Sequence, residues 1–347
     1  MRPTATRSLS VTLARSAPTR RTLLATTLGA ALAAPLPSLP ARAQASAGPS
    51  WPARTVRLVT LAAPGAGTDA VARTLADALA RRWEQPVVID NRPGGEGIVS
   101  IETFLAAREG NHTLLFNPTG VWTALHLIHE NLSFDPVREL IPLSLVVQDF
   151  IALAASPRLG AATLADIVAT ARARPGALTW ASVPSVPYLA FTSFLKAAGL
   201  ELSYVPYRNP LASLPDLAEG RVDLGFLPLS PMVGTAQAGK LRLVAVASDE
   251  RGPLAPDVPT ANEAGFPALS MFGGHCLFAP REMPEALRAR IAADVREVTS
   301  NEEVARRLRA MGYIPRTESG PELAALLGGE RKRWTEVAER YGAKPPQ

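Results

Sequence analysis

A glycine-containing segment after a strand-like run is the strongest candidate for chemistry in this sequence. Residues 64–70 read Pro-Gly-Ala-Gly-Thr-Asp-Ala, and residues 56–61 before them have the apolar character of a strand. The Gly65-x-Gly67-x-x-Ala70 spacing matches the dinucleotide-binding pattern, and Asp90 stands about where a ribose-binding acid belongs. The same features suit a phosphate or a carboxylate, because free N–H groups at a helix start carry partial positive charge. A dinucleotide site, a simple anion site and a structural turn therefore all stay open.

Other polar loops follow strand-like runs further along the chain. Residues 182–188 and 207–210 each lie between a predicted strand and a predicted helix, so their polar side chains and free N–H groups could hold the far end of a ligand. Plain capped turns would have the same composition. The turns at 91–97 and 117–120 would stand at the same sheet edge as the first glycine loop, and for 91–97 a simple strand-to-helix connection with Arg92 pairing locally is the favoured explanation.

The histidines and the single cysteine do not form a catalytic pattern. His126 and His129 have the i, i+3 spacing of a zinc site, but without a third ligand nearby we expect surface histidines. His275 and Cys276 are neighbours in a predicted strand, so they point to opposite faces, and Cys276 should be a buried small hydrophobe. With no nucleophile elbow, Walker loop or metal framework, nothing in these residues demands catalysis, and we expect no metal site.

The elements that must position these loops alternate between short strands and longer helices. This alternation predicts an α/β fold with helices on both faces of mainly parallel sheets. Two linking regions, 141–155 and 257–271, suggest two lobes joined by two crossover strands. Lobe 1 would comprise residues 51–145 plus 271–347 and lobe 2 residues 146–270. Such a pair of lobes closes around a ligand in the cleft between them.

The charge of the chain is concentrated in its first residues. The formal net charge is +5 and the pI about 9.7. Six of the 36 basic residues and none of the 31 acidic residues lie in 1–45, so the remainder carries a net charge of −1. This balance argues against nucleic acid as a partner, because such binding needs a basic patch on the folded domain.

Residues 1–45 have the features of an export signal. A basic region ends in Arg20-Arg21, a mostly apolar run follows to residue 39, and 41–45 offer cleavage sites with small residues. A disordered arm is the alternative. Residues 19–24 also resemble a twin-arginine signal, although the Phe and Lys often found there are absent. We expect a cleaved signal and a periplasmic protein, and its one cysteine cannot form an intramolecular disulfide.

Segments spread in order over the mature chain resemble the Bug family, the extracytoplasmic solute-binding receptors of tripartite tricarboxylate transporters. Each segment is a weak signal, and their order and spacing carry the resemblance. The segments are Arg57-Leu58-Val59, Gly65-x-Gly67-Thr68-Asp69, Gln85-Pro86-Val87-Val88, Asn91-Arg92-Pro93-Gly94, Thr113-Leu114-Leu115, Phe134-Asp135-Pro136, Val205-Pro206-Tyr207-Arg208, Gly220-Arg221-Val222-Asp223-Leu224, Ala238-Gly239-Lys240-Leu241-Arg242 and Pro256-Asp257-Val258-Pro259-Thr260-x-x-Glu263-Ala264-Gly265.

The resemblance implies a two-lobed periplasmic binding protein of the Venus flytrap type, without cofactor or catalysis. A small organic anion would lie between the lobes, one carboxylate on loop 63–69 and its far end on the loops of the second lobe. The protein would be a monomer that presents this ligand to membrane transporter subunits or to a sensor. The implied ligand-binding residues are Ala63, Gly65, Ala66, Gly67, Thr68, Asp69, Thr119, Ser182, Ser185, Tyr188, Tyr207 and Asn209.

Two departures from the family pattern reduce the number of polar groups expected in the cleft. The family often has a longer Gly/Asn/Ser-rich loop with His at 182–188, and commonly Asp-Asn where Leu227-Pro228 stand here. We therefore expect a less polar ligand than citrate, such as an aromatic or short aliphatic carboxylate. The enzyme alternative is an exported NAD(P)-dependent oxidoreductase that uses the Gly65–Ala70 spacing and Asp90. A third alternative is an interaction protein whose cleft stays empty.

Overall fold

The computed structural model describes residues 51–107, 111–129, 131–207 and 209–342. The chain divides into two compact units, Met1–Gly48 and Pro49–Gln347. The predicted export signal, residues 1–45, lies outside the described residues. No helix in the described ranges has the length and apolar character needed to cross a bilayer.

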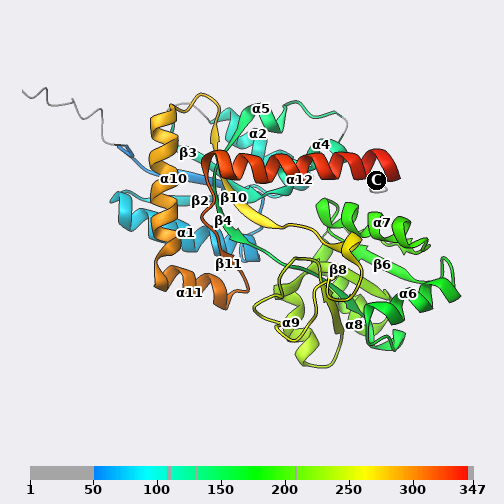
Figure 1. Ribbon diagram of the computed structural model, residues 1–347. Helices are drawn as coiled ribbons and strands as arrows, with labels where there is room; N and C mark the ends of the chain where they lie inside the picture. Colours follow the sequence, from blue (N-terminus) through cyan, green and yellow to red (C-terminus); the bar gives the residue numbers. More distant parts are fainter. Residues whose placement is uncertain (1–50, 108–110, 130, 208, 343–347) are drawn as a thin grey trace, which may run out of the picture. The chain divides into compact units, whose positions relative to one another are not determined.

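The first lobe is built on a six-stranded mixed sheet (Figure 1). Its strands, in spatial order, are β2 (Val87–Asn91), β1 (Val56–Thr60), β3 (Thr113–Pro118), β10 (Gly274–Pro280), β4 (Leu140–Gln148) and β11 (Ile314–Pro315). Strands β2, β1, β3 and β4 share one direction, whereas β10 and β11 run antiparallel to their neighbours. The antiparallel β10 enters the middle of the sheet because it returns from the other lobe.

The second lobe repeats this plan with five strands. Their spatial order is β7 (Ser203–Tyr204), β6 (Thr179–Ser182), β8 (Leu224–Pro228), β5 (Ile151–Ala155) and β9 (Arg242–Val246). Four strands share one direction and β5, which arrives from the first lobe, is antiparallel to both neighbours. The predicted α/β fold with two crossover strands is thus confirmed, and both sheets are mixed because each contains a strand that crosses between the lobes.

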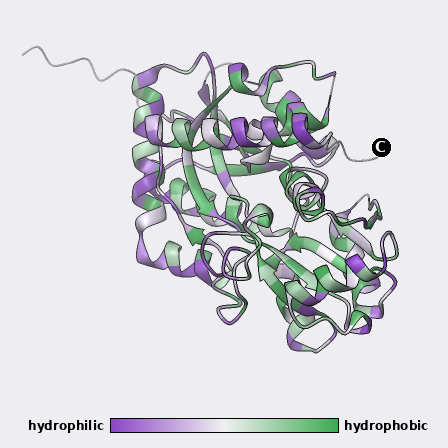
Figure 2. Cartoon of the chain, turned by 45° about the vertical axis from the view of Figure 1, so that its right-hand side comes forward, coloured by the Kyte–Doolittle hydropathy of each residue, from purple (hydrophilic) through white to green (hydrophobic). Residues whose placement is uncertain are grey.

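Helices cover both faces of each sheet. In the first lobe α1 (Gly67–Trp83), α10 (Glu285–Ser300) and α11 (Glu302–Ala310) pack on one face, and α2 (Ile98–Ala106) with the first half of α12 (Gly320–Tyr341) on the other. In the second lobe α6 (Leu164–Ala173) and α7 (Val186–Ala198) face α8 (Ser213–Glu219) and α9 (Leu229–Gln237) across the sheet. Figure 2 shows apolar strands and outer helices banded polar and apolar. This banding is typical of helices with one face on a core.

Short helical segments complete the connections. They are η1 (Gly95–Gly97), α3 (Gly120–Thr123), α4 (Leu125–Ile128), α5 (Pro136–Glu139), η3 (Pro157–Leu159), η4 (Pro210–Ala212) and η5 (Pro267–Leu269). Polar side chains cap two of these segments. At α5 the Asp135 side chain accepts a hydrogen bond from the Val137 N–H, and at η3 the Ser156 side chain accepts one from the Arg158 N–H. These caps fix where each loop turns back toward its sheet.

Three segments connect the lobes. The first crossing runs from β4 through Asp149 and Phe150 into β5, and the second ends at Gly273 just before β10. The two crossings contact each other, because the Asp149 N–H donates to the Gly273 carbonyl over 3.2 Å. The third is α12, drawn in red in Figure 1, which reaches from the first lobe to α7. The lobe boundaries expected at 146 and 271 fall inside β4 and just before β10, and the precise division stays a prediction.

Candidate ligand-binding site

A cavity of about 580 Å³ lies between the two lobes. Loops that follow strands of both sheets line it, together with both crossings. From the first lobe come Leu61, Gly65–Thr68, Glu96, Pro118–Val121 and Gly312–Tyr313; from the second Val183, Ser185–Pro187, Leu211 and Pro228–Pro231; and from the crossings Asp149–Ile151 and Met271–His275. A cavity at the loop ends of two α/β lobes is where ligands of such folds bind.

The first wall is the loop that begins helix α1. Gly65 adopts φ +83°, a left-handed conformation that favours glycine, and this turns the chain so that α1 begins at Gly67. The N-cap residue Ala66 has no side chain that could accept a hydrogen bond from the helix. The N–H groups of Gly67 and Thr68 therefore have no partner within the helix and border the cavity.

Asp69 holds this loop in shape. Its carboxylate accepts hydrogen bonds from the Gly65 N–H at 2.9 Å, from Arg73 Nε at 2.9 Å and from Asn91 Nδ2 at 2.8 Å. Burial by itself would raise the pKa of Asp69, but the hydrogen bonds from Arg73, Asn91 and Gly65 outweigh it and hold the pKa below its usual value. Asp69 is 2% exposed and does not line the cavity, so its role is to position the loop.

The opposite wall is the start of helix α7 in the second lobe. Its N-cap is Ser185, whose side chain makes no capping hydrogen bond, and Val186 follows at the first helical position. Ser185 also approaches the first lobe: a methyl group on Gly120 would lie 2.9 Å from the Ser185 hydroxyl oxygen. Two helices from different lobes, α1 and α7, thus begin at one cavity without side-chain caps.

Six of the twelve residues predicted for the site line this cavity, and their contact with a ligand stays a prediction. They are Gly65, Ala66, Gly67, Thr68, Thr119 and Ser185. The other six, Ala63, Asp69, Ser182, Tyr188, Tyr207 and Asn209, lie outside its lining.

Most of these six residues have local partners or surroundings of their own. The Ser182 hydroxyl donates to the Phe226 carbonyl at 3.0 Å, and the Tyr207 hydroxyl donates to Asp216. Asn209 accepts the Leu211 N–H and so caps a short helix. Tyr188 is buried in an aromatic cluster with Trp180 and Tyr204, and Ala63 is exposed to solvent.

Five polar residues of the cavity were not predicted as site residues: Glu96, Asp149, Ser230, His275 and Tyr313. His275 Nε2 lies 2.9 Å from the Thr68 hydroxyl oxygen, and the His275 ring lies between the rings of Phe116 and Tyr313. The expectation that Cys276 is buried on the opposite face is confirmed, because it packs at 0% exposure in the core beneath α2 and α12. The alternation of side chains along the strand was the available signal in the sequence, because it places His275 on the face opposite to the one that buries Cys276.

The charged side chains that line the cavity are acidic; its described lining contains no lysine or arginine. Glu96 lies 2.9 Å from His129 Nε2. Burial raises the pKa of Glu96, and the hydrogen bond from His129 opposes that rise. Burial likewise raises the pKa of Asp149, against the opposing influence of His275. The described lining thus offers N–H groups but no lysine or arginine for an anion.

The two histidines expected at the surface are instead half-buried. His126 Nδ1 lies 3.2 Å from Arg331 Nη1, and burial with the Arg331 charge lowers the pKa of His126 to about 4. His129 pairs with Glu96 as described. Among the residues that the structure describes, no three His, Cys, Asp or Glu side chains gather as a metal site would require.

Asp90 does not serve the cavity. Its carboxylate lies 2.8 Å from Arg92 Nε and 3.6 Å from Arg57 Nη1, and it is absent from the cavity lining. A ribose-binding acid would have to reach the same space as the Gly65–Gly67 loop. The geometry therefore fits the simple anion interpretation of this loop better than the dinucleotide one.

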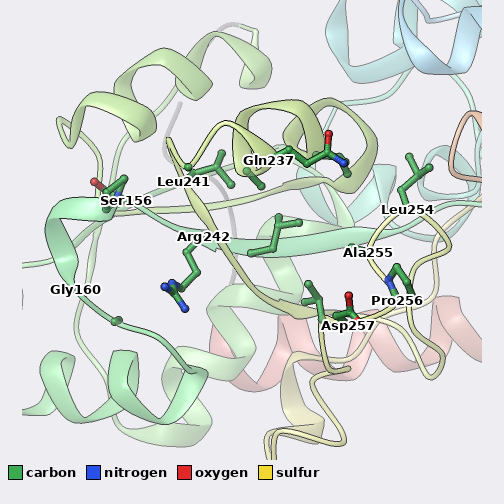
Figure 3. A pocket seen from close by; sticks show the side chains of 16 residues that line it. Ser156, Gly160, Gln237, Leu241, Arg242, Leu254, Ala255, Pro256 and Asp257 are labelled. Carbon is green, nitrogen blue, oxygen red and sulfur yellow. The ribbon is translucent and has the colours of Figure 1, made fainter.

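A second hollow, also of about 580 Å³, lies beside the edge strand β9 (Figure 3). Ser156, Gln237, Arg242 and Asp257 contribute polar atoms to it. None of its lining side chains has a buried polar atom without a partner, and no long helix begins there. The interlobe cavity is lined by residues with an unpartnered buried polar atom, Asp149 and His275, and the long helices α1 and α7 begin at it. We therefore take the interlobe cavity as the candidate site.

Two α/β lobes that enclose such a cavity define a solute-binding protein of the two-lobed type. Comparison with known proteins narrows this class: residues 71–343 match the tripartite tricarboxylate transporter family receptor. The chain belongs to this family, which is a family of receptors, and the resemblance to the Bug family is confirmed.

Relatives match most of the chain. A protein of the tcbD–tcbE intergenic region of Pseudomonas sp. (strain P51) is 30% identical over 298 residues, which cover 84% of this chain and 88% of the relative. BugT of Bordetella pertussis is 26% identical, with 85% of this chain and 91% of BugT covered.

Solved structures support the same fold. An R. palustris protein with adipate has a TM-score of 0.77 at 28% identity, with 85% of this chain and all of that chain covered. MatC from Rhodopseudomonas palustris with bound malate has a TM-score of 0.72 at 29% identity, with 83% of this chain and 99% of MatC covered.

Proposed function

We propose that this protein is a periplasmic receptor that captures a small organic carboxylate with an apolar body in the interlobe cavity. It would present the ligand to the membrane subunits of a tripartite transporter or to a sensor. The observation that carries the proposal is that α1 and α7, from different lobes, both begin at the cavity without side-chain caps. Free N–H groups at a helix start bind carboxylates because they add hydrogen bonds to the partial positive charge of the helix end.

The cavity lining limits how many negative charges the ligand brings. Neither lysine nor arginine lines it in the described chain, and Asp149 and Glu96 are acidic. A tricarboxylate would therefore bury charges without counter-charges, which is costly. One carboxylate on the Gly67–Thr68 N–H groups satisfies the site, so a monocarboxylate fits better than citrate.

The rest of the lining is apolar and suits an aromatic or aliphatic body. Its larger apolar side chains are Leu61, Val121, Phe150, Ile151, Val183, Val186, Leu211, Leu229, Met271 and Phe272. Burial of apolar ligand surface stabilises a complex by about 25 cal/mol per Å² before the cost of ordering is subtracted. The relatives solved with adipate and malate support carboxylates as the ligand class.

A thermal-unfolding screen tests this function. The mature protein is refolded from denaturant to remove any co-purified ligand, and then screened with benzoate, 3-phenylpropionate, pentanoate, citrate, sugars and NAD. A ligand at 100 times its Kd adds about 2.7 kcal/mol, which raises Tm by roughly 5–10 °C at about 2–4 °C per kcal/mol. We expect such shifts with monocarboxylates.

Three outcomes would contradict the proposal. A larger shift with citrate would overturn the inferred ligand class, and a shift with NAD alone would favour the oxidoreductase. No shift with any small molecule would favour an interaction protein with an empty cleft. Periplasmic export is tested separately by the mass of the protein from a periplasmic fraction, which should correspond to cleavage within residues 41–45.

A further inference from the structure

Glu96 stands in a turn whose backbone favours glycine at every position. The four residues of the turn Gly94–Gly97 have φ values of +127°, +54°, +53° and +109°, and the third of them is Glu96. A residue with a side chain is strained in this left-handed region. Such strain persists only where the surrounding structure holds it, and it is concentrated at functional sites. An acid at this one position of a glycine turn therefore points to a function for its side chain.

Buried hydrogen bonds tie this turn to the segment that leads into the glycine loop of α1. Asn117 Oδ1 accepts the Leu61 N–H at 2.8 Å, and Asn117 Nδ2 donates to the Ser100 hydroxyl oxygen at 2.9 Å. The Ser100 hydroxyl in turn donates to the Gly97 carbonyl at 2.8 Å. Asn117 and Ser100 are both fully buried. The turn that carries Glu96 therefore has a fixed place beside the glycine loop, and both line the interlobe cavity.

His129 holds the Glu96 carboxylate by one of its two oxygens. His129 Nε2 lies 2.9 Å from Glu96 Oε2, and among the described residues it is the only hydrogen-bond partner of this carboxylate. The side chains of His129 and Glu96 are 28% and 29% exposed, so the pair is accessible and is not sealed in a core. The carboxylate also acts on the second lobe, because burial, Tyr188 and Glu96 together raise the pKa of Tyr204 to about 12.

The second oxygen of Glu96 has the same hydrogen-bonding character in both protonation states of the pair. The hydrogen bond between Nε2 and Oε2 holds one proton between these two atoms, whether it belongs to the nitrogen or to the oxygen. Oε1 carries no proton in either case, so it can only accept. A ligand carboxylate at neutral pH has no proton to donate, and the described lining contains no lysine or arginine that could compensate for two facing acceptors.

We infer that Glu96 is a specificity-determining residue that excludes ligands with a second carboxylate. The inference rests on the proposed function, in which the first carboxylate binds the Gly67–Thr68 N–H groups. Glu96 lines the same cavity from the neighbouring loop, so the second carboxylate of a ligand long enough to reach it is repelled, whereas a methyl end or an aromatic edge is not. The absence of basic side chains alone would only fail to stabilise a second carboxylate. Glu96 adds a repulsion that a single substitution can remove.

Pairs of acids with equal chain length test this inference by calorimetric titration of the refolded protein. The pairs are butanoate and succinate, pentanoate and glutarate, and hexanoate and adipate. In the unmodified protein we expect the largest preference for a monocarboxylate among the three pairs to be at least tenfold, the equivalent of about 1.4 kcal/mol. Glu96→Gln keeps the shape of the side chain and supplies an amide donor. In this variant that preference should fall below threefold, because the dicarboxylate binds more tightly.

Glu102→Gln is the matched control, because Glu102 is an exposed acid on α2 that accepts the Ser133 hydroxyl and does not line the cavity. Its loss should leave the preference unchanged, and an equal fall in both variants would overturn the inference. A preference below tenfold in the unmodified protein, or one that stays above threefold in Glu96→Gln, would overturn it as well while leaving the proposed function intact. Binding of no carboxylate would refute the proposed function itself. If Glu96→Gln does not fold, Glu96→Gly, which suits the left-handed turn, decides by the same thresholds.

Discussion

Thr68 Oγ1 and His275 Nε2 lie 2.9 Å apart although 207 residues separate them in the chain. This contact ties the loop that begins α1 to the strand that follows the second crossing. The loop that is proposed to hold the carboxylate is therefore mechanically linked to the segment that joins the lobes.

Removal of the Thr68 hydroxyl should weaken ligand binding. Thr68→Val leaves His275 Nε2 buried without its partner, which costs about 1–3 kcal/mol of stability. It also removes a polar group from the carboxylate site, so we expect carboxylate affinity to fall about tenfold, the equivalent of about 1.4 kcal/mol. Thr74→Val is the control, since the Thr74 hydroxyl bonds to the Ala70 carbonyl away from the cavity. Equal affinity losses in both variants would contradict the role of Thr68.

A methyl group at Gly67 should disrupt the same loop. The hydroxyl of Tyr313 lies where a Cβ on Gly67 would be, and the Tyr313 ring is packed edge-on against His275. Gly67→Ala should therefore displace Tyr313 and abolish measurable binding in the thermal screen. Gly328→Ala on α12 has open space around it and should stabilise the protein by about 0.5–1 kcal/mol without changing affinity. Tight binding by Gly67→Ala would show that the loop does not hold the ligand.

Helix α12 should stabilise both lobes. Leu327 is buried in the first lobe and Trp334, at 1% exposure, in the second. Trp334→Ala should cost about 3–5 kcal/mol of unfolding free energy, the usual range for a buried tryptophan. Glu336→Ala, at an exposed position two residues further along the helix, should change stability by less than about 0.5 kcal/mol. Denaturant unfolding followed by circular dichroism measures both, and similar values would refute the predicted role of α12.

Asp69 should make stability depend on acid pH. Its pKa in the folded protein lies below the ordinary value of 3.8, so its contribution is present above that value and is lost as pH falls through the folded pKa. Asp69→Asn should lower the free energy of unfolding at neutral pH. Between about pH 5 and 2 this free energy should fall less in the variant than in the unmodified protein. Unfolding midpoints measured across this range check the difference. Parallel pH profiles for the two proteins would show that the hydrogen bonds of Asp69 contribute nothing.

Local pattern was enough to predict the α/β lobes, the loop at Gly65–Gly67 and the opposed directions of His275 and Cys276. These follow from periodicity, from glycine at a tight turn and from the alternation of strand side chains, all of which act between neighbouring residues. The pattern did not show that Asp69, Ser182 and Tyr207 bond to their own surroundings. A polar side chain in a loop can bind a ligand or its neighbours, and composition is the same in both cases.

Three polar side chains of the cavity, Asp149, His275 and Tyr313, come together from distant parts of the chain. Asp149 lies in the first crossing, His275 after the second, and Tyr313 near the C-terminal helix. None of them is close in sequence to the glycine loop. They meet because β10 returns antiparallel into the middle of the first sheet. Long-range strand pairing of this kind leaves no short-range signature, so the charge of the site became visible only in the folded chain.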